Sequence, residues 1–129
     1  MSPPTPAATI ERFSRLLSDA RIDVLLELYE EDAVFAPEPG VAVQGRRAIR
    51  SALQPFLDMK ARMSGEVQKV LEGPHTALVS YRWELEGTGP DGTPVRLEGT
   101  SSDVLRRRPD GSWGVLIDDP WGAMASPAA

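Results

Sequence analysis

The chain of 129 residues contains no cysteine and a single histidine, His75. Without cysteine it can form no disulfide bond, no thiolate metal site and no thiolate nucleophile. A lone histidine cannot build a histidine-cluster metal site, and its position in the turn Gly73-Pro74-His75 predicts a surface residue. We therefore expect no metal site in this protein.

The chain also lacks an excess of positive charge and any long hydrophobic run. It carries 14 lysine and arginine residues against 19 aspartate and glutamate residues, and its pI is about 4.9. With no basic face to release counterions, neither nucleic acid nor an anionic membrane is an expected partner. No apolar run spans a bilayer, and the first residues lack the charged and apolar regions of a signal peptide. These absences predict a cytoplasmic protein.

The length fits one domain, which we expect over residues 9–122. Residues 1–8 are rich in proline and alanine, and residues 123–129 are mostly small. Segments of this composition cannot bury enough apolar surface to offset the loss of conformational entropy. Both ends are therefore predicted to be disordered tails.

Three helical patterns come first in the chain. Apolar residues recur at helical spacing from Ile10 to Leu17 and again from Ile49 to Leu57. Between them, Asp23 can cap a shorter helix that carries apolar side chains as far as Tyr29. Pro55 lies inside the third pattern, so we expect it to kink or split that helix.

Strand patterns dominate the remainder. Two short strands are predicted at residues 33–36 and 41–43, and longer ones at residues 63–71, 76–86, 95–108 and 112–121. Helices followed by a run of strands predict an α+β fold. We expect the long antiparallel strands to curl around the three N-terminal helices and to enclose a conical cavity, with odd-numbered side chains facing inward.

The last two strands form a hairpin around the turn Pro109-Asp110-Gly111. An uninterrupted register places Leu105 opposite Val115 and Asp103 opposite Ile117. The inward face would then carry two carboxylates among apolar residues, its members being Leu97, Asp103, Leu105, Trp113, Val115, Ile117 and Asp119. This anomaly is the strongest functional signal in the chain.

Two interpretations of Asp103 stay open. In the structural one, a backbone N–H, Tyr29, Tyr81 or Trp83 satisfies the carboxyl group. In the functional one, burial keeps the group protonated, so that it can donate or transfer a proton.

Asp119 and Glu38 are weaker candidates for a catalytic role. Asp119 precedes a proline and is equally consistent with a turn, and Glu38 lies in a tight turn where carboxylates are usually solvated. Asp118 has an even number and is therefore predicted to lie on the outward face of its strand, exposed to solvent. Large aromatic and methionine side chains favour a pocket for an apolar or aromatic ligand, lined by Phe13, Leu17, Tyr29, Phe56, Met59, Met63, Tyr81, Trp83, Leu105, Ile117 and Trp121.

Three segments carry a resemblance to a known family: residues 25–35 (LLELYEEDAVF), 45–49 (GRRAI) and 113–122 (WGVLIDDPWG). Together they resemble the nuclear-transport-factor-2-like superfamily, in its SnoaL-like and ketosteroid-isomerase-like branch. The resemblance covers residues 9–122 and implies the cone-shaped roll of that superfamily, also called cystatin-like. It does not name a reaction, because this fold carries isomerases, cyclases, dehydratases, hydrolases and association modules.

The isomerases of this branch offer three positions for comparison. Their general base, an aspartate after the first strand, falls at Pro37, next to Glu38, and their oxyanion-binding tyrosine falls at Phe13. Their second oxyanion donor, an aspartic acid on the penultimate strand, falls at Asp103. The resemblance therefore implies an acid–base role for Asp103, while the chain departs from the steroid isomerases at the other two positions.

These observations leave three functions. The first is an enzyme that isomerises, cyclises or dehydrates a hydrophobic carbonyl compound by acid–base chemistry and needs no cofactor. The others are a carrier that binds a ligand in the same pocket and a dimerisation module without a working site. The resemblance implies a homodimer formed through the outer face of the sheet, where Val104 is predicted to lie opposite Leu116 with Leu78 beside them.

Overall fold

The computed structural model describes residues 5–122. Three helices come first: α1 (Pro6–Ser18), α2 (Ile22–Glu27) and, after two strands, α3 (Arg46–Asp58). The seven strands are β1 (Tyr29–Glu38), β2 (Val41–Gln44), β3 (Arg62–Glu72), β4 (Thr76–Thr88), β5 (Pro94–Thr100), β6 (Ser102–Arg107) and β7 (Trp113–Asp119). The predicted α+β fold with three N-terminal helices is confirmed.

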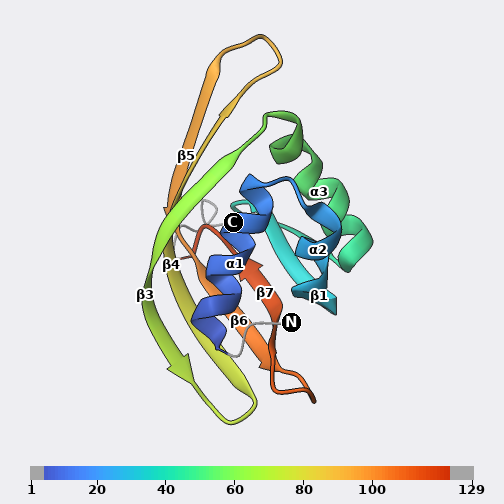
Figure 1. Cartoon of the computed structure of the whole chain (residues 1–129), viewed down its shortest axis with the longest axis vertical. Helices are drawn as coiled ribbons and strands as arrows, with labels where there is room; N and C mark the ends of the chain where they lie inside the picture. The colour runs from blue at the N-terminus through green and yellow to red at the C-terminus, as the bar shows by residue number, and fades with distance from the viewer. Residues whose placement is uncertain (1–4, 123–129) are drawn as a thin grey trace.

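All seven strands belong to one curved sheet. Its order is β2-β1-β7-β6-β4-β3, and β5 pairs with β4 on the same side as β6. Neighbouring strands are antiparallel, except that β1 and β7 are parallel. The sheet is therefore mixed but mainly antiparallel, whereas the sequence predicted an antiparallel sheet. Figure 1 shows α1 lying in the concave side of the sheet, while the end of the β4–β5 hairpin extends past the helices.

Helix α1 begins earlier than the sequence pattern predicted. The Thr5 hydroxyl caps the helix by accepting a hydrogen bond from the Ala8 backbone N–H at 3.1 Å. Pro6 follows in the first turn, where its fixed φ suits the helix and its missing N–H has no intrahelical partner to lose. The prediction of a disordered tail over residues 1–8 is therefore wrong for residues 5–8. Residues 1–4 and 123–129 lie outside the described residues.

Two further boundaries differ from the prediction. Helix α2 ends at Glu27, and Tyr29 is the first residue of β1, where it pairs with Val115 of β7. Pro55 does not split α3, because it lies near the C-terminal end of the helix. The carbonyl that loses its hydrogen bond to the proline belongs to Ser51, which is exposed to solvent.

The core lies between the helices and the concave face of the sheet. Buried side chains of α1 and α3, among them Ile10, Leu17 and Leu53, form one cluster with the inward side chains of the sheet. The Thr9 hydroxyl also donates to the Trp113 carbonyl at 3.2 Å, which fixes α1 against β7. Within residues 5–122, no helix is long and apolar enough to cross a membrane.

Candidate functional site

A cavity remains inside this core, closed on one side by α1 and α3 and on the other by the sheet. Its volume is about 60 Å³. Its walls are mainly apolar, and they are formed by Ile10, Phe13, Leu17, Phe35, Pro37, Leu53, Phe56, Met63, Tyr81, Trp83, Leu85, Ser101, Asp103, Val115, Asp118, Pro120 and Trp121.

The carboxyl groups reach the cavity through an irregularity in the β6–β7 hairpin. Leu105 pairs with Val115 as predicted, but Val104 pairs with Ile117, which leaves Leu116 as an extra residue on β7. Such a bulge moves the side chain of every later residue of the strand to the opposite face of the sheet. Asp118 therefore pairs with Asp103 and lies on the cavity wall, while Ile117 lies on the outer face with 41% of its surface exposed.

Hydroxyl groups hold the two cavity carboxyls from either side. Ser101 donates from Oγ to Oδ2 of Asp103 at 2.5 Å, while its Oγ accepts from the Tyr81 backbone N–H at 3.1 Å. Tyr29 donates from its phenol to Oδ2 of Asp118. Oδ1 of Asp103 is buried and has no hydrogen-bond partner. A buried polar atom without a partner is costly, so this oxygen is available to a proton or a ligand.

The two carboxyl groups share their protons unequally. Burial raises the pKa of Asp103 well above its ordinary value, and the negative charge of Asp118 raises it further. Burial also raises the pKa of Asp118, but the hydrogen bonds from Tyr29 and from the protonated Asp103 act in the opposite direction. Because two adjacent carboxylates cannot both ionise easily, the pair retains a proton that Asp103 holds more firmly.

Several predicted site residues lie on the cavity wall. Asp103 does, and so do seven of the predicted ligand-binding residues: Phe13, Leu17, Phe56, Met63, Tyr81, Trp83 and Trp121. Trp83 and Trp121 are also fixed in place, because their indole N–H groups donate to the carbonyls of Pro120 at 2.7 Å and Ala36 at 3.0 Å. Their rings pack edge to face, 5.4 Å apart, and offer the cavity an apolar surface.

Other predicted site residues do not line the cavity. The register shift removes Asp119, whose carboxylate accepts a hydrogen bond from the Trp121 backbone N–H, and Ile117, which faces outward. Glu38 is exposed, and its neighbour Pro37 takes the place on the wall.

The three remaining predicted ligand-binding residues also do not line the cavity, each for a separate reason. Leu105 is fully buried in the core, and Tyr29 is fully buried behind Asp118. Met59 packs against Gly87 of β4, where a side chain at position 87 would collide with it.

The sequence prediction missed the polar residues Asp118 and Ser101. One signal could have pointed to Asp118, because two consecutive aspartates on a strand place one carboxyl on each face whatever the register. Ser101 has an odd number, but no sequence pattern marks it as a partner of Asp103. Phe35 and Leu53 are further apolar wall residues that the sequence did not single out, and Pro37, the position of the isomerases' general base, also lies on the wall.

A second hollow, on the surface, is lined by charged residues that include Glu30, Arg106 and Arg108. Arg106 donates to Glu30 at 2.9 Å and to Asp32 at 3.1 Å, and Arg108 donates to Glu30 at 2.9 Å. Arg46 donates to the Tyr29 carbonyl at 2.6 Å. These arginines are committed to acceptors within the protein, so the internal cavity is the better candidate for a functional site. Within residues 5–122, no three histidine, cysteine, aspartate or glutamate side chains gather as metal ligands would.

Comparison with known proteins identifies a matching family. A model of the SnoaL-like domain family matches residues 10–113, a span that includes Asp103 and ends just before the bulge. No curated protein matches the chain.

Solved structures match the chain at low sequence identity. A ketosteroid isomerase-like protein from Erwinia carotovora atroseptica SCRI1043 is 18% identical with a TM-score of 0.76, over 86% of this chain and 88% of that one. An NTF2-like protein with a cystatin-like fold from Novosphingobium aromaticivorans is 20% identical with a TM-score of 0.74, over 95% and 82%. The epoxide hydrolase/cyclase-like enzyme SalBIII, described with a role in pyran ring formation in salinomycin, is 19% identical with a TM-score of 0.67, over 91% and 89%. These similarities establish an NTF2-like, cystatin-like fold.

Proposed function

The chain belongs to the SnoaL-like domain family, and from this premise we propose that it is an acid–base enzyme that needs no cofactor. Its substrate is a small, mainly apolar carbonyl compound. The observation that carries the proposal is Oδ1 of Asp103, a buried carboxyl oxygen without a partner on the wall of an apolar cavity. Dedicated acids and bases are found where burial and a second carboxyl group separate two pKa values.

The pair of carboxyls supports distinct roles for its two members. Asp118, which receives the Tyr29 hydrogen bond, is the base that removes a proton from the carbon next to the carbonyl group. Asp103, which holds its proton more firmly, is the acid that donates to the carbonyl oxygen as negative charge develops there. Return of the proton to a different carbon isomerises the substrate, and loss of a β-hydroxyl group as water dehydrates it.

Proton exchange at the α-carbon of simple ketones tests this proposal without knowledge of the natural substrate. Cyclohex-2-enone and acetophenone in D₂O, followed by proton NMR, should lose their α-proton signals faster with the protein than without it. Asp103→Asn and Asp118→Asn should each slow exchange by about 10²- to 10⁴-fold.

The matched control is Glu38→Gln, which removes an exposed carboxylate next to the wall residue Pro37 but outside the cavity. Glu38 is not among the groups that shift the pKa of Asp103 or Asp118, so exchange should stay within about twofold of wild type. If wild type and the Asp103 and Asp118 variants exchange at equal rates, the proposal is wrong.

A carrier that uses the same cavity is the second candidate, and the apolar walls around Trp83 and Trp121 favour it equally. A carrier would bind these ketones, as a change in tryptophan fluorescence, without accelerating exchange. Binding and exchange measured on the same samples therefore separate the two functions.

A further inference from the structure

We propose that Tyr29 is a positioning residue that decides which of the two cavity carboxyls is the base and which is the acid. The inference rests on the proposed acid–base function of Asp103 and Asp118 and deepens it. Tyr29 does not line the cavity, so it acts through Asp118, to which its phenol donates a hydrogen bond.

Tyr29 is held firmly enough to perform this role. Its side chain is fully buried, and its ring packs edge to face against Phe13 with the ring centres 5.9 Å apart. Its backbone carbonyl accepts from Nε and Nη2 of Arg46 at 3.0 and 2.6 Å. Pairing of β1 with β7 places the residue beside Val115, on the strand that carries Asp118. The phenol therefore has little freedom to leave Asp118.

The hydroxyl groups that donate to the two carboxyls differ in acidity and therefore in strength as hydrogen-bond donors. Asp118 receives the phenol of Tyr29, whereas Asp103 receives the alcohol of Ser101. A phenol is the more acidic donor and stabilises a carboxylate more strongly than an alcohol does. This difference places the negative charge on Asp118 and the proton on Asp103.

Apart from the carboxyl pair itself, no charged side chain among the described residues lines the cavity. Helices α1 and α3 contribute only apolar wall residues, Ile10, Phe13, Leu17, Leu53 and Phe56. Asp119, the neighbour of Asp118 in the chain, adds a negative charge that opposes ionisation of Asp118. Without the phenol, only the hydrogen bond from Asp103 would oppose burial and this charge at Asp118, and the preference for an ionised Asp118 should weaken.

Direct titration tests the inference independently of turnover. In protein labelled with ¹³C at the aspartate carboxyls, the first ionisation of the pair should appear mainly at Asp118 and the second at Asp103. Tyr29→Phe keeps the ring that packs on Phe13 but removes the donor. We expect the first ionisation to rise by about one pH unit or more and to spread over both carboxyls.

Tyr81→Phe is the matched control. Tyr81 is also a buried tyrosine, but its hydroxyl pairs with Ser14 at 2.8 Å and not with a carboxyl group, so the first ionisation should not move. The inference is overturned if Tyr29→Phe leaves that ionisation unchanged or lowers it. This result would not depend on ketone exchange, so failure of the inference remains distinguishable from failure of the proposed function.

A second variant keeps the test valid if Tyr29→Phe does not fold. The chain contains two tyrosines, so Tyr81→Phe protein grown with 3-fluorotyrosine carries the label at Tyr29 alone. The fluorinated phenol is a more acidic donor, so the first ionisation of the pair should fall relative to unlabelled Tyr81→Phe. An unchanged or raised value would overturn the inference.

Discussion

Asp103 and Asp118 are direct partners across the β6–β7 pair, and the extra residue Leu116 brings them together. In an uninterrupted hairpin, Asp103 would face Ile117 and Asp118 would point away from the cavity. The bulge thus replaces Asp119 with Asp118 as the second inward carboxyl and moves an isoleucine out of the apolar space. Bulges are common beside active sites, where they redirect a side chain in this way.

The first prediction concerns the pH dependence of stability in Asp103→Asn. The folded state raises the pKa of Asp103 because burial and the Asp118 charge oppose ionisation. The stabilising contribution of the protonated acid is complete below the unfolded pKa, about 3.9, and is lost as pH rises through the folded pKa.

Asparagine resembles the protonated acid and does not titrate. Relative to wild type, Asp103→Asn should gain stability as pH rises above 4, by up to about 1.4 kcal/mol per pH unit, until the folded pKa is passed. Urea unfolding at a series of pH values measures the difference. A difference that stays constant from pH 4 to pH 8 would contradict a buried, protonated Asp103.

The second prediction concerns Glu30, whose side chain is 14% exposed and bonds to both Arg106 and Arg108. Burial of the carboxyl opposes ionisation, but the two arginine hydrogen bonds prevail and lower the pKa of Glu30. This contribution is present above the unfolded pKa and is lost as pH falls through the folded pKa. Glu30→Gln should therefore destabilise the protein at pH 7 by about 1–3 kcal/mol, and the loss should shrink in acid.

The control for Glu30 is an exposed ion pair of similar length. Asp23 contacts Arg50 at 2.6 Å, but 85% of its side chain is exposed. Asp23→Asn should change the free energy of unfolding by less than about 1 kcal/mol. Equal losses for Glu30→Gln and Asp23→Asn would show that burial of Glu30 adds nothing.

The third prediction concerns Gly65 on β3, which pairs with Trp83 and lies under the Tyr81 ring. A Cβ atom at this position would approach the Arg82 carbonyl oxygen to 2.3 Å and the Tyr81 ring to 2.6 Å. Gly65→Ala should therefore displace the Tyr81 ring from the cavity wall and destabilise the protein by about 1–3 kcal/mol. Ser64→Ala, an exposed change on the same strand, should stay within about 0.5 kcal/mol. Thermal unfolding of both variants checks the prediction.

The sequence predicted the fold better than the site. Hydrophobic periodicity located the helices and the long strands, because a buried face repeats along a whole element. It located their ends less well. Thr5 and Pro6 form a helix start inside a segment whose composition resembles a tail, and Tyr29 leaves α2 for β1 because it pairs with β7, a contact distant in sequence.

The cavity carboxyls show why the alternation of odd and even positions along a strand could not define the site by itself. Counting from the turn gave the correct partners as far as Leu105 and Val115, and the bulge then exchanged the facing of Ile117, Asp118 and Asp119. Nothing in the composition around Leu116 marks an extra residue. The predicted inward facing of Asp103 is confirmed, since its strand carries no bulge between the turn and the cavity, and its raised pKa follows from its burial.

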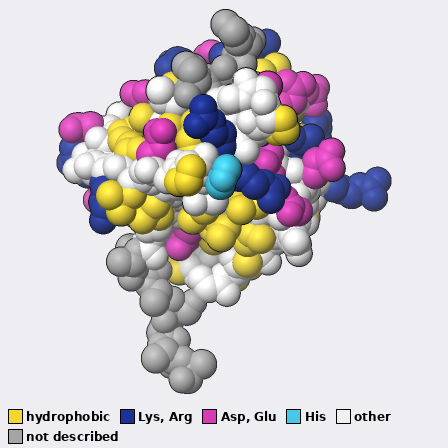
Figure 2. All heavy atoms as spheres, turned by 90° about the horizontal axis from the view of Figure 1, so that it is seen from below, with side chains coloured by type: hydrophobic (Ala, Val, Ile, Leu, Met, Phe, Trp, Pro, Cys, Tyr) yellow, Lys and Arg dark blue, Asp and Glu magenta, His cyan; other side chains and the backbone are white. Residues whose placement is uncertain are grey.

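The last prediction concerns the outer face of the sheet, through which we propose that the protein forms a homodimer. Four apolar residues are direct partners in a row across β3, β4, β6 and β7: Leu71, Leu78, Val104 and Ile117. Ile117 takes the place predicted for Leu116 opposite Val104. The row starts beside the β3–β4 turn, where Figure 2 shows hydrophobic side chains gathered near His75.

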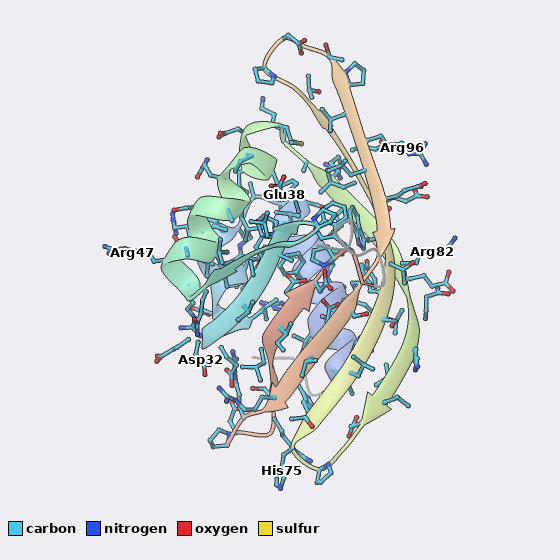
Figure 3. All side chains as sticks on the ribbon, turned by 180° about the vertical axis from the view of Figure 1, so that it is seen from behind. Asp32, Glu38, Arg47, His75, Arg82 and Arg96 are labelled. Atoms are coloured by element: carbon cyan, nitrogen blue, oxygen red, sulfur yellow. The ribbon has the colours of Figure 1, made fainter. Side chains whose placement is uncertain are left out.

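The surroundings of this row support a two-fold contact. Arg82 and Arg96 extend from the outer side of the sheet (Figure 3), and Glu66 and Glu84 lie within 4 Å of them. A face with an apolar row and charges of both signs further along the same strands can match its own copy. Leu71 and Ile117 are 55% and 41% exposed, which is costly for apolar side chains that nothing covers.

Sedimentation of two lysine variants tests the dimer. Ile117→Lys places a charge at the β7 end of the row, whereas Val41→Lys places the same charge on β2, at a valine with the same 41% exposure. Wild type and Val41→Lys should sediment as dimers at micromolar concentration, and Ile117→Lys should sediment as a folded monomer, because a buried unpaired ammonium group costs several kcal/mol. A monomeric wild type, or an Ile117→Lys variant that still dimerises, would show that this face is not the interface.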